Sequence, residues 1–415
     1  MEGKVRLMGA SFTIRRLRSG AILVLSAGIA LGCGDGDNNP AGPGPEPPPD
    51  VGITPSAGCT DGLLEHGGLY RICFPATWNG DLVLFAHGYV APQNDLAIPE
   101  ESIGGQPASS VITGMGYAYA TTSYRANGLV ADVAVDDILE LMDTVQHRYR
   151  PDPARAVVVG FSEGALVAVL AAERHADRFN GALAGCGPIG DFRAQLDYIA
   201  DFRVVFDYFY PSLIPGDALQ VPESVRAHWN DIYTPAIVVA LAARPEAARQ
   251  LFAVTGAPTA GSDVQSLAET AIGLLWYNTF GTADAQARLG GQPFDNSARL
   301  YAGSDDDAAL NAGVARYTAD PAALSSIARF TTSGAPQAPL INLHTTGDPI
   351  VPFSQASLYE DKVHQAGNGN FTQVDVVRAG HCNFQASELL DAFNDLWQQI
   401  ADQPPNIPLA LWALP

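Results

Sequence analysis

The first part of the chain alternates between short, nearly continuous apolar runs and longer segments in which apolar residues recur every three or four positions. The short runs are typical of buried β-strands, and the longer segments are typical of helices that cover them. The predicted strands are 67–86 (with a turn at 78–81), 117–122, 155–160 and 181–188. Between them we predict helices over 132–150, with Asp132 as the N-cap, and over 163–175.

The same alternation returns near the C-terminus. Residues 339–348 and 371–377 predict strands, and residues 354–366 and 385–401 predict helices. Residues 190–335, between the two parts, have a largely helical pattern that is rich in aromatic residues. Strands that alternate with helices on both sides of an insertion predict an α/β fold, with a mostly parallel central sheet covered by helices on both faces.

The N-terminus has the pattern of an export signal. Basic residues precede an apolar run from Ala21 to Leu31, which is too short to cross a membrane but has signal-peptide proportions. Ala30 to Cys33 resembles a bacterial lipobox, in which the cysteine is acylated after cleavage. Residues 34–55 are rich in Pro and Gly and predict a linker. We therefore expect an exported lipoprotein at the cell surface or in the periplasm, tethered to a membrane through Cys33, with simple secretion as the alternative.

Composition and charge narrow the classes of partner. The hydrophobic fraction of 47% and the charged fraction of 16% predict a globular protein with a large core. The formal net charge of −21 would repel phosphate backbones, so we expect no nucleic-acid partner. The sequence contains no clustered set of His and Cys ligands, and we expect neither a metal nor a cofactor.

Four cysteines follow Cys33, and they are Cys59, Cys73, Cys186 and Cys382. An even number in an exported chain predicts two disulfides, for which three pairings are possible. The short loop favours a local Cys59–Cys73 pair, which would leave Cys186 to pair with Cys382. Free buried thiols are the alternative.

The stretch Gly160-Phe161-Ser162-Glu163-Gly164 lies between a predicted valine-rich strand and a helix of small residues. A sharp turn at this position would expose the Ser162 hydroxyl, and the flanking glycines would let the strand and helix approach each other. The N–H of Glu163, at the start of the helix, could stabilise a developing oxyanion. The alternative is a structural serine in an ordinary turn.

A serine hydroxyl needs a base to act as a nucleophile at neutral pH. His381, just after the last predicted strand, is the predicted base, and Asp348, at the end of the preceding strand, is the acid that would orient it. Both would project from the carboxyl ends of parallel strands, where open α/β sheets place their sites. His364 and Asp375 are the weaker alternatives.

The order Ser162, Asp348, His381 resembles the nucleophile–acid–histidine order of the α/β-hydrolase superfamily. Residues 85–89, Phe-Ala-His-Gly-Tyr, are similar to the family's His-Gly motif after the third strand. The resemblance implies that the N–H of Tyr89 is a second oxyanion donor beside that of Glu163. His87 is expected to shape its loop.

The N-terminal pattern and the resemblance together predict a division of the chain. The expected parts are a signal peptide with a lipobox-like site (1–33), a linker (34–55), a hydrolase core (56–189 and 336–402), a helical lid or cap insertion (190–335) and a C-terminal tail (403–415).

A bridge between Cys186 and Cys382 would hold the His381 loop beside Ser162, since that loop must lean over the strand that carries Cys186. Tannase-like and feruloyl-esterase relatives also have a cysteine after the histidine, but they pair it with a cysteine just before the serine. Phe161 occupies that position here, which argues against this branch.

The resemblance implies a serine hydrolase that cleaves carboxylic esters through an acyl-enzyme intermediate. Aromatic residues of the insertion would form the pocket and favour apolar, aromatic or polymeric esters. One alternative is a prolyl-oligopeptidase-like serine peptidase, which shares the order of the three residues. The other is a non-catalytic surface-binding protein on a hydrolase scaffold. The sequence leaves the natural ester and the oligomeric state open.

Overall fold

The computed structural model describes residues 52–402. The predicted signal peptide with Cys33, nearly all of the linker and the C-terminal tail lie outside the described residues. The chain divides into the units Met1–Pro49 and Asp50–Pro415, and the described residues belong to the second unit. Within residues 52–402, no helix combines the length and the hydrophobicity that crossing a membrane requires.

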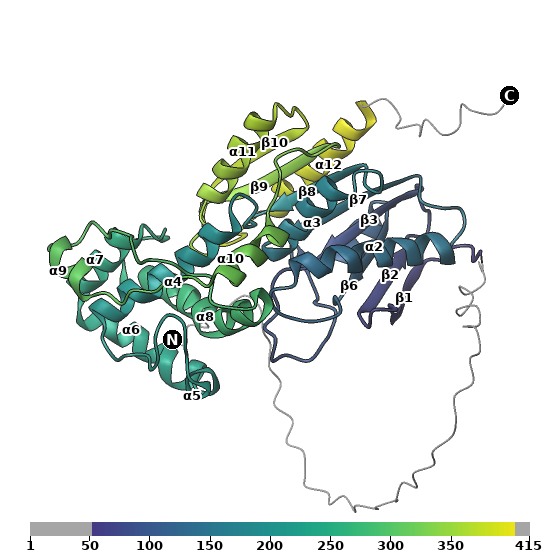
Figure 1. Cartoon of the computed structure of the whole chain (residues 1–415). Helices are drawn as coiled ribbons and strands as arrows, with labels where there is room; N and C mark the ends of the chain where they lie inside the picture. Colours follow the sequence, from purple (N-terminus) through teal and green to yellow (C-terminus); the bar gives the residue numbers. More distant parts are fainter. Residues whose placement is uncertain (1–51, 403–415) are drawn as a thin grey trace, which may run out of the picture. The chain divides into compact units, whose positions relative to one another are not determined.

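An eight-stranded sheet forms the centre of the described chain, in the order β1-β2-β6-β3-β7-β8-β9-β10 (Figure 1). The strands are β1 (Gly58–Leu63), β2 (Leu69–Phe74), β3 (Asp81–Ala86), β6 (Ala118–Thr122), β7 (Arg155–Phe161), β8 (Gly181–Gly185), β9 (Leu340–Gly347) and β10 (Phe371–Ala379). Strand β2 pairs antiparallel with β1 and β6, and the other neighbours pair in parallel. The sheet is therefore mostly parallel, as the sequence predicts. Strands β4 (Ser102–Ile103) and β5 (Gln106–Pro107) form a separate pair.

Helices cover both faces of the sheet, which explains why its strands are nearly continuous apolar runs. Leu82 and Leu84 of β3 pack with α2, α3 and α11, whereas Val83 and Phe85 pack on the opposite face with α1 and α12. These helices are α1 (Ala108–Gly114), α2 (Ala131–Arg148), α3 (Glu163–Arg174), α11 (Ser354–Ala366) and α12 (Ala386–Asp402).

Residues 190–335, all of which are described, form helices and loops without a strand. The helices are α4 (Phe192–Phe209), α5 (Glu223–Ala227), the π-helix η1 (Trp229–Tyr233), α6 (Thr234–Ala243), α7 (Pro245–Thr255), α8 (Val264–Leu289), α9 (Asp307–Gly313), α10 (Pro321–Ser326) and the 3-10 helix η2 (Ile327–Phe330). Aromatic residues such as Phe202, Phe206 and Trp229 are buried together in a separate hydrophobic core. Most of the aromatic content of the insertion therefore stabilises the insertion itself.

Two local features differ from the sequence-based prediction. Helix α2 begins at Ala131, and Asp132 lies in its first turn, so the prediction that Asp132 is the N-cap is wrong. The carboxylate of Glu163 performs the capping instead, because its Oε1 accepts from the N–H groups of Val130 and Ala131 at 2.8 and 3.2 Å. Strand β1 is absent from the prediction because it is an exposed edge strand without a buried apolar face.

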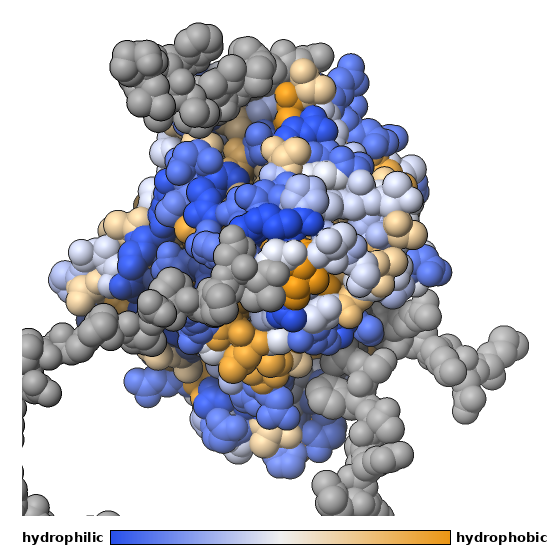
Figure 2. Space-filling model, turned by 90° about the vertical axis from the view of Figure 1, so that its right-hand side faces the viewer, coloured by the Kyte–Doolittle hydropathy of each residue, from blue (hydrophilic) through white to orange (hydrophobic). Residues whose placement is uncertain are grey.

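Figure 2 shows one face of the molecule, on which hydrophilic residues predominate and apolar residues form small, separate patches.

The turn between β7 and α3 depends on close backbone packing. A Cβ atom on Gly164 would overlap the carbonyl oxygen of Ala86 in β3, and a Cβ atom on Gly160 would overlap that of Gly164. Only glycine therefore lets the first turn of α3 lie against the ends of β3 and β7.

We expect Gly164→Ala to lower the free energy of unfolding by about 3 kcal/mol, because backbone atoms cannot move aside as a flexible side chain could. Urea unfolding followed by circular dichroism measures this change. The matched control is Gly114→Ala, where no heavy atom outside the helix's own backbone lies within 4 Å of the added Cβ. The control should change stability by no more than about 0.5 kcal/mol. Equal stability of the two variants would contradict the packing argument.

Candidate active site

Ser162 occupies the turn between β7 and α3 in a strained backbone conformation. Its φ and ψ angles are 57° and −126°, which a residue with a side chain rarely adopts. The surrounding structure holds this conformation, because the Ser162 N–H donates to the Gly185 carbonyl of β8 at 2.9 Å and its carbonyl accepts from the N–H of Ala165 at 3.0 Å. The result is a hydroxyl presented at the carboxyl edge of the parallel strands.

His381, in the loop after β10, lies between Ser162 and Asp348. Its Nε2 is 2.9 Å from Ser162 Oγ, and its Nδ1 is 2.7 Å from Asp348 Oδ2. An ionised carboxylate only accepts hydrogen bonds, so Nδ1 carries the ring proton of the neutral histidine. Nε2 is then free to accept the proton of the Ser162 hydroxyl.

The loop after β9 holds Asp348 in place. The carboxylate is fully buried, and its Oδ1 accepts from the N–H groups of Ile350 and Val351 at 2.9 and 3.0 Å. His344 of β9 supports this loop because its Nε2 donates to the Val351 carbonyl at 2.9 Å. Burial lowers the pKa of His344. The contribution of His344 is absent from the sequence-based prediction, since it depends on how the loop folds back.

The alternative residues lie elsewhere. His364 is exposed on α11 and Asp375 is exposed on β10. The ring of His87 is buried and stacks on Tyr124 with 4.0 Å between ring centroids, and its Nδ1 lies 2.7 Å from the Gly88 carbonyl. The structure therefore brings together Ser162, His381 and Asp348 rather than these alternatives.

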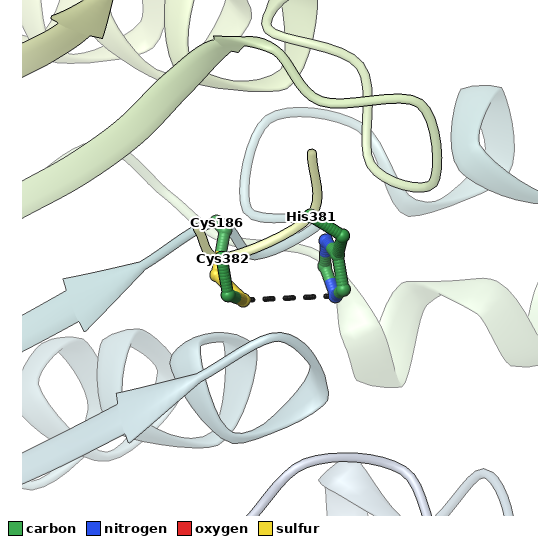
Figure 3. Close-up of side chains that lie close together, drawn as sticks. All are labelled: Cys186, His381 and Cys382. Atoms are coloured by element: carbon green, nitrogen blue, oxygen red, sulfur yellow. Dashed lines mark hydrogen bonds between the residues drawn. A yellow bond between two sulfur atoms is a disulfide. The ribbon is translucent and has the colours of Figure 1, made fainter. Parts of the chain in front are cut away.

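Two disulfides join the four cysteines, Cys59 to Cys73 and Cys186 to Cys382. The first joins residues that face each other in β1 and β2. The second joins the residue after β8 to the residue after His381, with 5.4 Å between the Cα atoms. Figure 3 shows this bridge beside the His381 ring, whose Nε2 is 3.6 Å from the Cys382 sulfur. The bridge thus ties the histidine loop to the strand that also binds the Ser162 backbone.

Both ends of this bridge have positive φ angles, 48° at Cys186 and 49° at Cys382. Such angles are uncommon for residues with a side chain. Three residues around the site, including Ser162, therefore have strained backbones that their surroundings must hold.

Two groups of side chains within residues 52–402 have the spacing of metal ligands. They are Cys186, His381 and Cys382, and His66, Asp137 and Glu140. In the first group the two sulfurs are bonded to each other, so they offer no thiolate. In the second group Arg125 donates to Asp137 at 2.7 Å, and this guanidinium supplies the positive charge that the carboxylate needs. In both groups, side chains that could bind a metal are thus already bonded to other protein groups.

A cavity opens beside Ser162, between the core and the insertion. Ser162, Tyr89 and Glu163 line it together with mainly apolar residues from α4, α8 and the loop after β9. Phe192, Tyr277 and Phe294 are the aromatic residues of the insertion that line it. Tyr89 and Glu163, the predicted sources of the oxyanion donors, thus share the cavity wall with Ser162.

Two carboxyl groups of low exposure are near this wall, Glu163 in the wall itself and Asp284 next to Tyr89. Burial, together with the nearby charge of Asp284, raises the pKa of Glu163 to about 8. Burial also raises the pKa of Asp284, whose Oδ2 accepts from the N–H of Leu129 and lies 3.5 Å from the Tyr89 hydroxyl. The sequence does not indicate this pair, because Asp284 comes from the insertion and Glu163 from the core.

A model of the prolyl oligopeptidase family matches residues 111–200, which include the turn at Ser162. No curated protein matches the chain significantly.

Several solved structures are similar at low sequence identity. An esterase from Thermogutta terrifontis is 13% identical, with 83% of this chain and 99% of that chain covered and a TM-score of 0.42. An esterase from Pyrococcus furiosus is 13% identical, with 84% and 99% covered and a TM-score of 0.44. An acylaminoacyl peptidase from Pyrococcus horikoshii is 9% identical, with 86% and 44% covered and a TM-score of 0.42.

Loss of the Cys186–Cys382 bridge should slow the reaction of Ser162 with a fluorophosphonate by about tenfold, because His381 would leave its hydrogen-bonded position for part of the time. The double variant Cys186→Ala/Cys382→Ala tests this in a time course of covalent labelling. The matched control is Cys59→Ala/Cys73→Ala, which removes the other bridge at the edge of the sheet and should react at the wild-type rate. A wild-type labelling rate without the Cys186–Cys382 bridge would contradict this role.

The raised pKa of Glu163 predicts a pH-dependent stability. The folded protein holds this proton up to a pH of about 8, whereas the ordinary pKa is 4.5. The unfolded chain therefore releases the proton first, and this contribution to stability, complete at low pH, is lost as the pH rises from about 4.5 to about 8. Glu163→Gln keeps the capping oxygen but carries no titratable proton.

We expect Glu163→Gln to gain stability relative to the wild type across this pH range, by on the order of 2–4 kcal/mol at its upper end. Urea unfolding between about pH 4 and pH 9 measures the difference. The surface control Glu100→Gln should follow the wild-type curve. Parallel curves for Glu163→Gln and the wild type would show that Glu163 ionises alike in the folded and unfolded chains.

Proposed function

We propose that this chain is a serine hydrolase of the α/β-hydrolase superfamily and that it cleaves carboxylic esters through an acyl-enzyme intermediate. The observation that carries the proposal is the hydrogen-bonded series Ser162 Oγ–His381 Nε2–Asp348, with distances of 2.9 and 2.7 Å, at the edge of a mainly apolar cavity. The three side chains come from the ends of three different strands, and the fold has no other evident reason to align them.

In the proposed mechanism Ser162 attacks the ester carbonyl while His381 Nε2 takes the hydroxyl proton. Asp348 stabilises the imidazolium that forms, and the N–H groups of Glu163 and Tyr89 stabilise the oxyanion. When the tetrahedral intermediate collapses, His381 gives its proton to the leaving alkoxide and the acyl group stays on Ser162. Water then attacks the acyl group with His381 again as the base, which releases the acid and restores the hydroxyl.

The lining of the cavity favours uncharged substrates. Among residues 52–402, Glu163 is the only acidic residue that lines it, and the Glu163 carboxyl already accepts from two backbone N–H groups. Because a peptidase that binds a free amino terminus needs an available negative charge, this cavity fits the apolar group of an ester better. We therefore propose apolar, aromatic or polymeric esters as the substrate class.

A serine peptidase is the second candidate. The match of residues 111–200 to the prolyl oligopeptidase family favours it, and that family uses the same order of nucleophile, acid and histidine. Both candidates use the same three residues, so the substrate distinguishes them.

Export is part of the proposal. The two disulfides are compatible with an exported protein, since such bonds persist in oxidising compartments. We propose that Cys33 is acylated and that residues 34–55 connect this anchor to the hydrolase core. Labelling cells with a radioactive or clickable fatty acid, with Cys33→Ala as the control, tests this proposal.

The wild type should hydrolyse p-nitrophenyl esters faster than aminoacyl-p-nitroanilides, and a fluorophosphonate should label it covalently. Ser162→Ala should lose the labelling and about 10⁴-fold in kcat, because it removes the nucleophile and leaves binding intact. Steady-state kinetics and intact-protein mass spectrometry provide the two readouts. Faster cleavage of the anilides would favour the peptidase, and a wild type without labelling would favour a binding protein.

A further inference from the structure

The cavity beside Ser162 adjoins the reacting residues on one side only. Among residues 52–402, its wall includes Ser162, Glu163 and Tyr89 but not His381. The residues that would supply the oxyanion N–H groups therefore line the cavity, whereas the base does not. The His381 side chain is 20% exposed, so a substrate can reach it from outside the cavity.

This arrangement distinguishes the two halves of an ester. In the tetrahedral intermediate the former carbonyl carbon carries Ser162 Oγ, the oxyanion, the leaving alkoxide oxygen and the acyl chain. His381 Nε2 has to reach both Ser162 Oγ and the leaving oxygen, because it moves a proton from one to the other. The alkoxide therefore lies on the His381 side. The acyl chain takes the remaining direction, toward a wall that His381 does not share.

Helices α4 and α8 of the insertion lie against each other and supply most of that wall (Figure 1). Leu196 and Ile199 of α4 line the cavity as half-buried apolar side chains. Leu196 packs against the core of the sheet, and Ile199 packs against the core of the insertion. The cavity therefore lies where two hydrophobic cores meet, and it offers apolar surface that a substrate can cover.

Gly281 of α8 leaves room in this wall. It is half-buried, lines the cavity and lies in the interior of a 26-residue helix, where glycine is less favourable than alanine. A Cβ atom added to Gly281 would have the Tyr89 hydroxyl at 3.8 Å as its one neighbour within 4 Å, counted over the described residues and apart from the helix's own backbone and the adjoining residues. Packing therefore does not require a glycine here, and the missing side chain enlarges the cavity.

The volume of the cavity limits the size of the group that it can take. This volume is about 110 Å³. An apolar protein cavity of about 150 Å³ holds one benzene molecule, so by proportion about four carbon atoms fit in this one. Phe294 in the same wall is 2% exposed and belongs to the core of the insertion. A longer chain would have to displace packed side chains of this kind.

We propose that the cavity is the acyl pocket and that Gly281 sets its size, so that the enzyme selects short apolar acyl groups with about four carbon atoms beyond the carbonyl. This inference rests on the proposed ester hydrolysis and narrows its substrate class. Because the alcohol leaves on the accessible side of His381, a large or polymeric alcohol fits as well as a small one. Gly281 is then a specificity-determining residue that contacts the acyl group.

The test compares two series of esters. The first varies the acyl chain from acetyl to decanoyl on p-nitrophenol, and the second varies the alcohol from methyl to octyl on a fixed butanoyl group. In the first series we expect kcat/KM to rise by about threefold per methylene group up to pentanoyl. It should then fall by about tenfold or more toward decanoyl, because longer chains overfill the pocket. Across the second series kcat/KM should change by less than about threefold, because the alcohol stays outside the pocket.

Gly281→Leu should lower the ratio of kcat/KM for pentanoyl to that for acetyl by about tenfold or more, because the new side chain fills the space of the acyl chain. The matched control is Ala283→Leu, an exposed position of the same helix outside the cavity wall, which should keep the wild-type ratio. If Gly281→Leu does not fold, as judged by circular dichroism, Gly281→Ala takes its place and should move the optimum from pentanoyl to butanoyl.

A length limit in the alcohol series instead of the acyl series, no limit in either, or a wild-type acyl profile in the Gly281 variant would overturn the inference. Calorimetric binding of 2-alkanones to Ser162→Ala separates this outcome from failure of the proposed hydrolysis, because these ketones have the carbonyl and the chain but no leaving group. An affinity that rises with chain length to the same limit, and no longer rises in Ser162→Ala/Gly281→Leu, supports the pocket even if no ester is cleaved. An affinity independent of chain length, or a rise that the second variant retains, contradicts it.

Discussion

The site depends on holding one serine in a backbone conformation that its side chain disfavours. Ser162 has a positive φ, and the N–H of this residue is bound by the end of β8. Its neighbour Gly164 lies so close to β3 that no side chain would fit there. The parallel sheet and the small residues of α3 are what make this turn possible, and the turn directs the hydroxyl toward His381.

The insertion is linked to this arrangement through the acid loop. Asp348 is oriented by its own loop, His344 supports the loop from β9, and α4 of the insertion binds the loop through Gln195 and Tyr198. The same helix supplies part of the cavity wall. Helix α4 therefore contacts both the cavity and the loop that carries Asp348, the residue that orients His381. A change in the insertion can for this reason affect both substrate binding and the position of His381.

Much of the fold was predictable because the strands are buried on both faces and therefore stand out as apolar runs. Ser162, Asp348 and His381 were identifiable since each follows such a run. Gln195 and the Glu163–Asp284 pair were not, because their roles depend on which groups lie opposite them after the insertion packs. The same reason explains the error at Asp132, where the Glu163 carboxyl reaches the helix terminus from another element. Most aromatic residues of the insertion form its hydrophobic core. Composition alone does not distinguish aromatic residues of a core from those that line a pocket.

In the proposed reaction Ser162 itself becomes acylated with the help of His381. The most direct measurement is rapid-quench analysis of the wild type with a p-nitrophenyl ester, followed by mass spectrometry of the proteolytic peptides. It should give an initial release of about one equivalent of p-nitrophenol per chain, with the acyl group on Ser162, and His381→Ala should give neither. An acyl group on another residue, or an unchanged burst in His381→Ala, would contradict the account.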